Sequence, residues 1–143
     1  QSKVRVHSGW IDTYKKIRQY IHDQVLSFDN VVVTGQSLGA ALATLCAIDI
    51  QYNFPDKNIA CVSFGSPKVG NKAFVESFSK RVFDTYRFVH GRDIIPLFPP
   101  FYSHVSFMRK FGPPRSWIFL PSICHHMISI EQVENLKGAL NID

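Results

Sequence analysis

The sequence predicts an α/β fold, in which a mainly parallel sheet carries helices on both faces. Strand-like apolar runs at 30–34, 59–64 and 85–90 alternate with stretches of helical periodicity. Such alternation is typical of βαβ units, whose strands must run parallel. At 143 residues and 45% hydrophobic composition, the chain has the size of one domain (1–143) with a single core.

The amino-terminal half predicts two strands and two helices. Residues 4–7 favour a short strand, and the β-branched run at 30–34 favours a second. The alanine-rich stretch after Gly39 favours a helix that fades near Pro55. An amphipathic helix lies between the two strands, because apolar residues recur there at the spacing of one helix face: Ile11, Tyr14, Ile17, Ile21 and Val25.

The carboxyl-terminal half continues the alternation. Residues 59–64 form a continuous apolar run that ends at Gly-Ser-Pro, which is typical of a buried strand. A helix over 71–80 and a strand over 85–90 follow, and a proline-rich, aromatic stretch contains an expected hairpin strand at 104–110. A last helix begins near Ser129, with Gln132 as its capping partner and one apolar face made of Ile130, Val133, Leu136 and Leu140.

One segment carries chemistry as well as structure. In residues 31–43, VVVTGQSLGAALA, a β-branched run meets an alanine-rich run through Gly35-x-Ser37-x-Gly39. A serine at the apex of such a strand–turn–helix is strained, and residues without a Cβ leave room for strand and helix to pass. The pattern is the nucleophile elbow typical of α/β-hydrolases. The alternative is an ordinary glycine-serine turn.

Composition excludes several classes of function. The 16 basic and 11 acidic residues give a charge of +5, but the basic residues are scattered and no recognition motif accompanies them, so we expect no nucleic-acid partner. No apolar run of transmembrane length and no secretory signal is visible in this sequence. Cys46, Cys61 and Cys124 have no metal-type spacing, so we expect buried thiols and no metal site, which slightly favours an intracellular, reducing compartment. The alternative, a single disulfide with one cysteine left over, would give the same pattern.

A catalytic triad of serine, acid and histidine would need its acid after Ser37 in the chain. The acid should lie close to the carboxyl end of a strand, where open parallel sheets carry their functional sites. Asp93 lies three residues beyond the strand expected at 85–90. Asp84 lies at the wrong end of that strand, and Asp56 lies in a turn after a helix. Asp93 is therefore the candidate acid; its alternative role is a turn aspartate that bonds the local backbone.

Three histidines follow Asp93 and are candidates for the general base. His104 falls within the expected hairpin strand, whereas His125 and His126 lie in the loop before the last helix, where a base is expected. Periodicity does not choose between the adjacent pair. His7 and His90 precede the acid in chain order, and we interpret them as hydrogen-bonding residues close to the site.

The sequence resembles the class 3 (fungal-type triacylglycerol) lipase family of the α/β-hydrolase superfamily. The motifs that carry the resemblance run in family order: VHSGW (6–10), VVVTGQSLGAALA (31–43), FGSPKVGN (64–71), RFVHGRDIIPLFPP (87–100) and HHM (125–127). The resemblance implies that Ser37 is the nucleophile and Asp93 the acid. It implies His126 as the base, because the family histidine is usually followed by an apolar residue, although His125 stands where the family commonly has an acid.

Family members also carry strands, a lid helix and one oxyanion donor upstream of VHSGW. The resemblance therefore implies a chain truncated at its amino terminus, with the backbone N–H of Leu38 as one oxyanion donor and no counterpart here of the second. Without a lid, residues 96–101 would form an apolar rim that suits a lipid surface or an acyl chain. The alternative is a proline-stiffened loop packed on the core.

The expected function is that of a serine carboxylic-ester hydrolase, a triacylglycerol lipase that needs neither a metal nor an organic cofactor and forms an acyl-enzyme. Two alternatives remain. One is a phospholipase A1 or another acyl esterase on the same scaffold. The other is a non-catalytic remnant that binds lipid or a partner through the same pocket.

Overall fold

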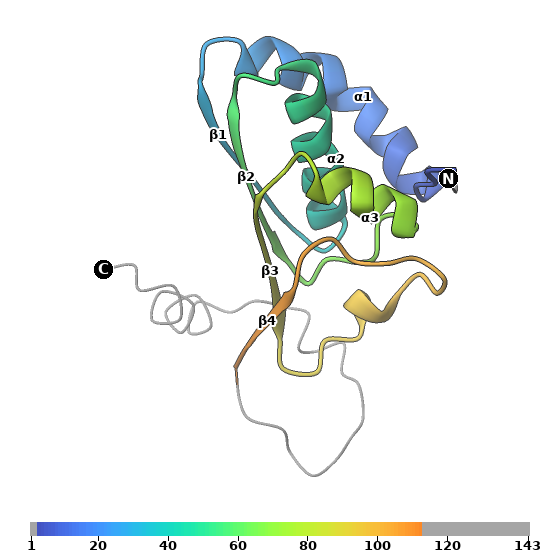
Figure 1. Cartoon of the computed structure of the whole chain (residues 1–143). Coiled ribbons are helices and arrows are strands. Elements are labelled where there is room, and N and C mark those ends of the chain that lie inside the picture. The colour runs from blue at the N-terminus through green and yellow to red at the C-terminus, as the bar shows by residue number, and fades with distance from the viewer. Residues whose placement is uncertain (1–2, 113–143) are drawn as a thin grey trace.

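The sheet confirms the parallel α/β prediction. The computed structural model describes residues 3–112, and these residues contain four strands in the spatial order β1-β2-β3-β4, each parallel to its neighbour. Figure 1 shows them running in the same direction, so that all their carboxyl ends lie at one edge. The strands are β1 (Asn30–Gln36), β2 (Asn58–Phe64), β3 (Asp84–His90) and β4 (Met108–Phe111).

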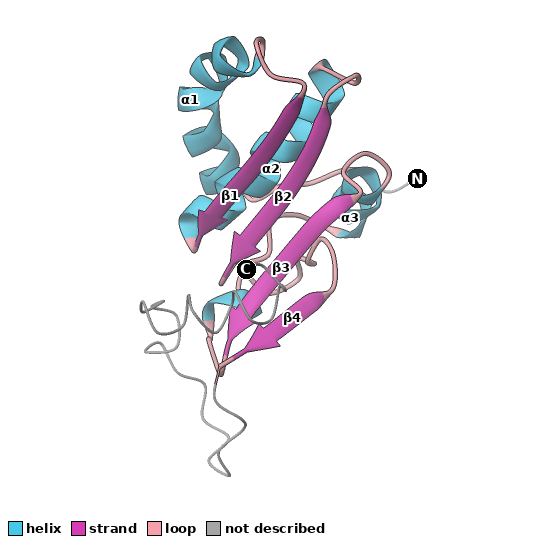
Figure 2. Ribbon diagram, turned by 90° about the vertical axis from the view of Figure 1, so that its left-hand side faces the viewer, coloured by secondary structure: helices cyan, strands magenta, loops and turns pink. Residues whose placement is uncertain are grey.

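The described α-helices pack on one face of the sheet. They are α1 (Ser8–Val25), α2 (Leu38–Asn53) and α3 (Lys72–Ser79). Figure 2 views the sheet from the opposite side, with the helices behind it. None of the described helices is long and apolar enough to cross a membrane. The helix predicted from Ser129 lies outside the described residues.

Helix α2 fills the space between α1 and the sheet because its side chains are small. Ala41, Ala47 and Ile50 are wholly buried, and they share a core with Tyr14 of α1 and Phe78 of α3. Small residues let a helix approach a sheet closely and give up little side-chain entropy on burial. The predicted stripe on α1 is only partly buried, since Tyr14 and Val25 are covered whereas Ile17 stays 42% exposed.

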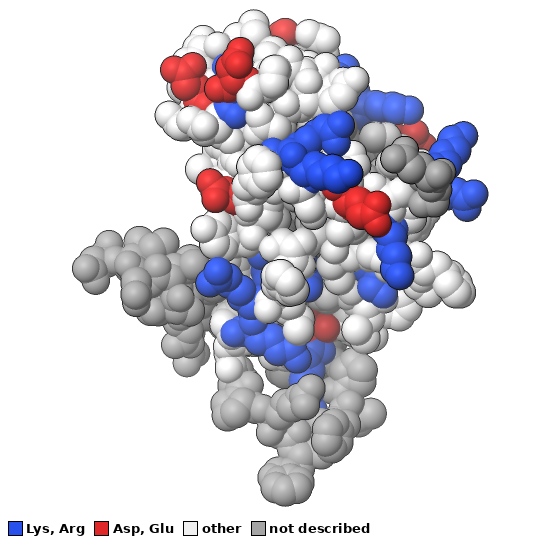
Figure 3. All heavy atoms as spheres, viewed as in Figure 1, with Lys and Arg blue, Asp and Glu red and all other residues white. Residues whose placement is uncertain are grey.

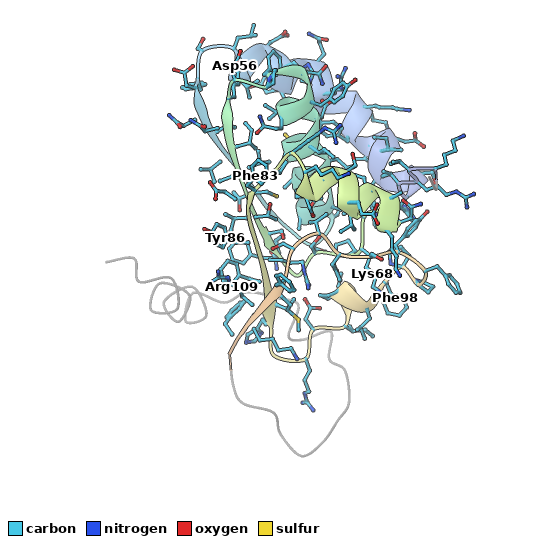
Figure 4. All side chains as sticks on the ribbon, in the orientation of Figure 1. Asp56, Lys68, Phe83, Tyr86, Phe98 and Arg109 are labelled. Carbon is cyan, nitrogen blue, oxygen red and sulfur yellow. The ribbon has the colours of Figure 1, made fainter. Side chains whose placement is uncertain are left out.

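A second apolar cluster lies on the face of the sheet away from the described helices. Phe64 and Phe88 stack with ring centroids 5.4 Å apart, and Phe111 joins them from β4. Close by, the Arg109 guanidinium stands 5.1 Å from the centroid of the Tyr86 ring, and Figure 4 shows both residues on this face. Alternation along each strand thus divides its apolar residues between two clusters.

Two predicted strands are wrong. Residues 4–7 form no strand: Val6 makes a single bridge to Gly70, and Arg5 bonds Asn71 through its backbone. No hairpin forms at 104–110, because β4 begins only at Met108 and runs parallel to β3. A parallel partner requires the chain to cross back over the sheet, and residues 91–107 make that crossover as a loop with one short 3₁₀ turn, Ile95–Leu97.

The two described cysteines are buried free thiols, as predicted. Burial raises the pKa of Cys46 to about 11 and that of Cys61 to about 12. Thiols with such high pKa values are protonated at neutral pH and are poor nucleophiles and metal ligands. Cys124 lies outside the described residues.

Candidate active site

Ser37 occupies the apex between β1 and α2 in a conformation that is rare for a residue with a side chain. Its φ is 54° and its ψ is −123°. Positive φ outside glycine costs free energy and persists only where the surroundings enforce it. Here the Ser37 N–H donates to Phe64 O at 3.0 Å, which fastens the apex to the end of β2.

Gly35 makes this turn sterically feasible. A Cβ at Gly35 would stand 2.2 Å from the backbone oxygen of Gly39, so strand and helix could not cross as they do. The sequence-based expectation holds for this glycine. At Gly39 an added Cβ would meet no heavy atom within 4 Å, so the described structure gives no steric reason for a glycine there.

The Ser37 hydroxyl does not cap the helix that it precedes. A serine at a helix N-cap usually has extended backbone angles and accepts a hydrogen bond from the second or third helical N–H. Ser37 has neither feature. Ser37 therefore does not stabilise the helix end as an N-cap serine usually does.

The start of α2 supplies donors beside this hydroxyl. The first backbone hydrogen bonds of the helix run from the N–H groups of Ala40 and Ala41 to Ser37 O. The N–H of Leu38 precedes them and belongs to the donors that a helix leaves unused at its start, where the helix dipole also favours negative charge. Leu38 itself is exposed. Its N–H thus has the chemistry that an oxyanion donor needs.

Asp93 lies at the carboxyl edge of the sheet, three residues after β3 ends. Its side chain is buried at 7% exposure, and its N–H donates to His90 O at 3.0 Å. One carboxylate oxygen, Oδ1, accepts the Ile95 N–H at 2.9 Å. Asp93 therefore makes the local backbone bond expected of a turn aspartate. It also lies just beyond the end of a strand, where the hypothesis of a catalytic acid expects it.

Strand order sets the spacing between the nucleophile and the acid. Ser37 follows β1 and Asp93 follows β3, with β2 between the two strands. Neighbouring strands stand about 4.8 Å apart, so the two strand axes are separated by about 10 Å. A triad places one imidazole between its serine and its acid, hydrogen-bonded to both. The strand positions are compatible with such a bridge.

His125 and His126, the candidate bases, lie outside the described residues. His104 does not lie in a strand; its Nε2 is 2.7 Å from Pro96 O, and burial with the nearby Arg87 charge lowers its pKa to about 4. His90 is buried at the end of β3 against Phe111, and His7 packs against Trp10. Within residues 3–112, no group of three or more His, Cys, Asp or Glu side chains could hold a metal ion.

Sequence reasoning missed Arg87. This residue lies in the middle of β3 and is only 6% exposed; burial lowers its pKa, and its Nε has no hydrogen-bond partner among the described residues. Its charge acts on His104 in the loop that follows the acid. An arginine between two aromatic residues in the middle of a predicted strand is the one signal in the sequence, but the strand pattern does not reveal what its side chain would meet.

Residues 1–103 match the family model described as Lipase (class 3). The chain belongs to the class 3 lipase family. A secreted mono- and diacylglycerol lipase of Malassezia restricta is 31% identical over 147 residues, covering 98% of this chain. The lipase of Rhizopus microsporus var. chinensis superposes with a TM-score of 0.75 at 26% identity, over 88% of this chain and 54% of that structure.

A further similar structure is that of a triacylglycerol lipase whose catalytic centre is described as a serine protease triad. It is 34% identical, with a TM-score of 0.64 over 70% of this chain and 41% of its own. These similarities confirm the predicted family and the α/β-hydrolase fold of this class 3 lipase chain. The chain spans about half the length, 47%, of the Malassezia relative.

We expect Gly35→Ala to lower the free energy of unfolding by about 1–3 kcal/mol, because a Cβ at 2.2 Å from the Gly39 oxygen forces strand and helix apart. Gly39→Ala is the matched control. It adds the same methyl group where nothing lies within 4 Å, and alanine favours a helix by up to about 1 kcal/mol. Urea denaturation of both variants measures the difference; equal stability would contradict the role given to Gly35.

Proposed function

We propose that this protein hydrolyses carboxylic esters of acylglycerols, with Ser37 as the nucleophile. The observation that carries the proposal is the strained Ser37 backbone, which holds a hydroxyl without a capping role beside the start of α2. Backbone strain of this kind is concentrated at functional sites. Family membership supports the reaction class, since the relatives that match include lipases and a phospholipase A1.

The proposed reaction proceeds through an acyl-enzyme. Ser37 Oγ attacks the ester carbonyl carbon while His126 takes the hydroxyl proton, and the same histidine then gives that proton to the departing alcohol as the ester C–O bond breaks. Asp93 orients the imidazole and stabilises its charged form. Water then attacks the acyl group by the same steps and releases the fatty acid and free Ser37. No cofactor takes part in these steps.

The oxyanion that forms in each step needs donors at the carbonyl oxygen. The N–H of Leu38 would supply one donor, helped by the dipole of the 16-residue helix α2. In well-studied hydrolases, loss of one such donor costs about 10²- to 10³-fold in turnover.

Relatives support the triad and the substrate class without assigning them. The triacylglycerol lipase with the serine protease triad is 34% identical to this chain. The Malassezia relative is named a mono- and diacylglycerol lipase and a secreted protein. The expectation of an intracellular, reducing compartment rests on the buried thiols alone, so the compartment of this chain stays a prediction.

A fluorophosphonate probe tests the nucleophile without a choice of substrate. We expect one adduct per folded chain, mapped to Ser37 by peptide analysis, and none after heat denaturation, because only the folded site activates the hydroxyl. Ser37→Ala should abolish labelling and leave the melting transition unchanged. A chain that melts cooperatively but does not label would favour the non-catalytic remnant.

The labelled chain can then be given emulsions of tri-, di- and monoacylglycerol and vesicles of phospholipid. Release of fatty acid from the acylglycerols supports the proposed substrate class. Release of the sn-1 fatty acid from phospholipid alone would instead support the phospholipase A1 alternative, since the fold does not determine the substrate.

Substitutions of the acid and the base test the remaining triad. We expect Asp93→Asn to slow labelling by about 10⁴-fold, as for the acid of other triads, because an amide cannot stabilise the imidazolium. Asp84→Asn, at the opposite end of β3, is the matched control and should leave the rate unchanged.

Of the single alanine variants, His126→Ala should abolish labelling and His125→Ala should retain it; the reverse result would move the base to His125.

We further propose that the rim beside Asp93 contacts the lipid–water interface. Leu97, Phe98 and Phe101 are exposed on the loop that follows Asp93, and Leu38 is exposed directly after Ser37. Exposed apolar side chains that gather in one region mark surfaces for lipids or partners. Lys68 lies next to Phe98 in Figure 4, and its backbone N–H donates to Phe98 O at 2.7 Å. Figure 3 shows basic side chains gathered around β4 and the neighbouring loops.

Phe101→Ser should weaken binding to lipid vesicles by about 10- to 150-fold, because burial of one phenyl ring contributes about 1.5–3 kcal/mol. Phe101 is 98% exposed, so the loss of its ring should not disturb the core. Phe83→Ser is the matched control. Phe83 is 83% exposed but precedes β3, at the amino ends of the strands. Vesicle co-sedimentation that falls equally for both variants would argue against a specific rim.

A further inference from the structure

The acid lies in a turn whose backbone holds one of its carboxylate oxygens. Asp93 Oδ1 accepts the Ile95 N–H, so one oxygen is tied to the start of the 3₁₀ turn Ile95–Leu97. That turn is closed by bonds from Leu97 N–H to Ile94 O and from Phe98 N–H to Ile95 O, both at 3.0 Å. A displacement of this turn would therefore displace the carboxylate.

His104 joins this turn to the body of the protein. Its Nε2 stands 2.7 Å from the carbonyl oxygen of Pro96. A carbonyl oxygen only accepts hydrogen bonds, so Nε2 carries the proton and donates it. The side chain thus bridges a part of the loop that Asp93 begins and a part that lies eight residues further along the chain.

The backbone that carries His104 is itself fixed on both sides. The Ser103 N–H donates to Gly70 O at 2.8 Å, and Val105 is buried in the main core. One residue further on, the Ser106 hydroxyl donates to Thr85 O at 2.8 Å at the start of β3. Gly70 is in turn held between Val6 and Ser103 by bridges to both. His104 therefore extends from a rigid support to the turn of the acid.

Burial, together with the charges around it, keeps the ring of His104 neutral. Burial, then the positive charges of Arg87 from β3 and Lys68 from the segment after β2, oppose protonation and lower the pKa to about 4, against the favourable bond to Pro96 O. Above about pH 5 the ring is then neutral, with one protonated nitrogen. Such a ring donates to Pro96 O without adding another cation to the loop of the acid.

We propose that His104 is a positioning residue: the bond from its ring to Pro96 O holds the 3₁₀ turn after Asp93 and so aims the Asp93 carboxylate at the base. This inference rests on the proposed function for its catalytic consequence. The hydrogen bond from His104 to Pro96 O, called the clamp from here on, does not depend on any reaction. His104 touches neither the substrate nor the nucleophile in this scheme, and it acts only through the turn and Asp93.

Two substitutions separate the hydrogen bond from the shape of the side chain. His104→Phe keeps a ring but removes the donor, whereas His104→Gln keeps an N–H close to the position of Nε2. His22→Phe is the matched control. His22 bonds Asp49 at 2.6 Å between α1 and α2, so its loss removes a histidine hydrogen bond away from the acid turn.

The first readout is amide hydrogen exchange by NMR on the whole 143-residue chain. We expect His104→Phe to raise exchange at Ile95, Leu97 and Phe98 by about tenfold or more relative to the rest of the chain, because their N–H bonds close the held turn. His104→Gln should restore most of the protection, and His22→Phe should leave these three amides unchanged. Equal exchange at these amides in the wild type and in His104→Phe would overturn the clamp.

The second readout is the pH profile of probe labelling at Ser37. A misplaced Asp93 stabilises the imidazolium less, so the pKa of the base falls; the midpoint of labelling should move to lower pH while the plateau rate drops in His104→Phe, with rescue in His104→Gln. A wild-type plateau and midpoint in His104→Phe would overturn the positioning role. A wild-type chain that does not label would contradict the proposed function, and the exchange readout would still decide the clamp.

Discussion

The close crossing of β1 and α2 at Gly35 is the constraint on which the candidate site depends. Because Gly35 has no Cβ, the backbone of Gly39 can pass directly over it, and Ser37 between them is forced to a positive φ. This geometry turns the serine away from its usual capping role and places its hydroxyl beside unused helix donors. The absence of a side chain at Gly35 therefore allows β1 and α2 to pack closely, and it also sets the conformation of Ser37 at the carboxyl edge of the sheet.

The parallel sheet brings the second half of the candidate site to the same edge. In a parallel sheet all strands end on one side, so residues that follow β1, β2 and β3 become neighbours whatever their separation in sequence. Backbone bonds across these ends, from Ser37 to Phe64 and from Gly65 to Phe88, fix the ends relative to one another. The edge is therefore a rigid frame, and the loop from 91 to 107 is the part that must be held separately.

That loop combines two properties that usually conflict. It exposes Leu97, Phe98 and Phe101, yet it carries the buried Asp93, whose position must be accurate for the proposed reaction. Bonds to the body of the protein resolve the conflict: the Lys68 N–H holds Phe98 O, the ring of His104 holds Pro96 O, and Ser103 holds Gly70. The apolar side chains can then face solvent on a loop whose backbone is well anchored.

The sequence by itself determined what local patterns encode. The β-branched and apolar runs predicted β1, β2 and β3, the periodic and alanine-rich stretches predicted the described helices, and the glycine spacing predicted the strained serine at position 37. These features follow from steric limits and burial within a few residues. The position of Asp93 beyond the end of β3 could also be predicted from the sequence, since chain order and strand ends follow from the same patterns.

Tertiary structure alone decided the rest. The expected hairpin at 104–110 became a parallel β4, because its pairing depends on where a long loop returns the chain, which no local pattern records. Residues 4–7 look like a strand, but within the described residues they form a single β-bridge, from Val6 to Gly70. The bond from His104 to Pro96 and the burial of Arg87 arise between segments that meet only after the sheet has formed, so their roles follow from contacts and not from composition.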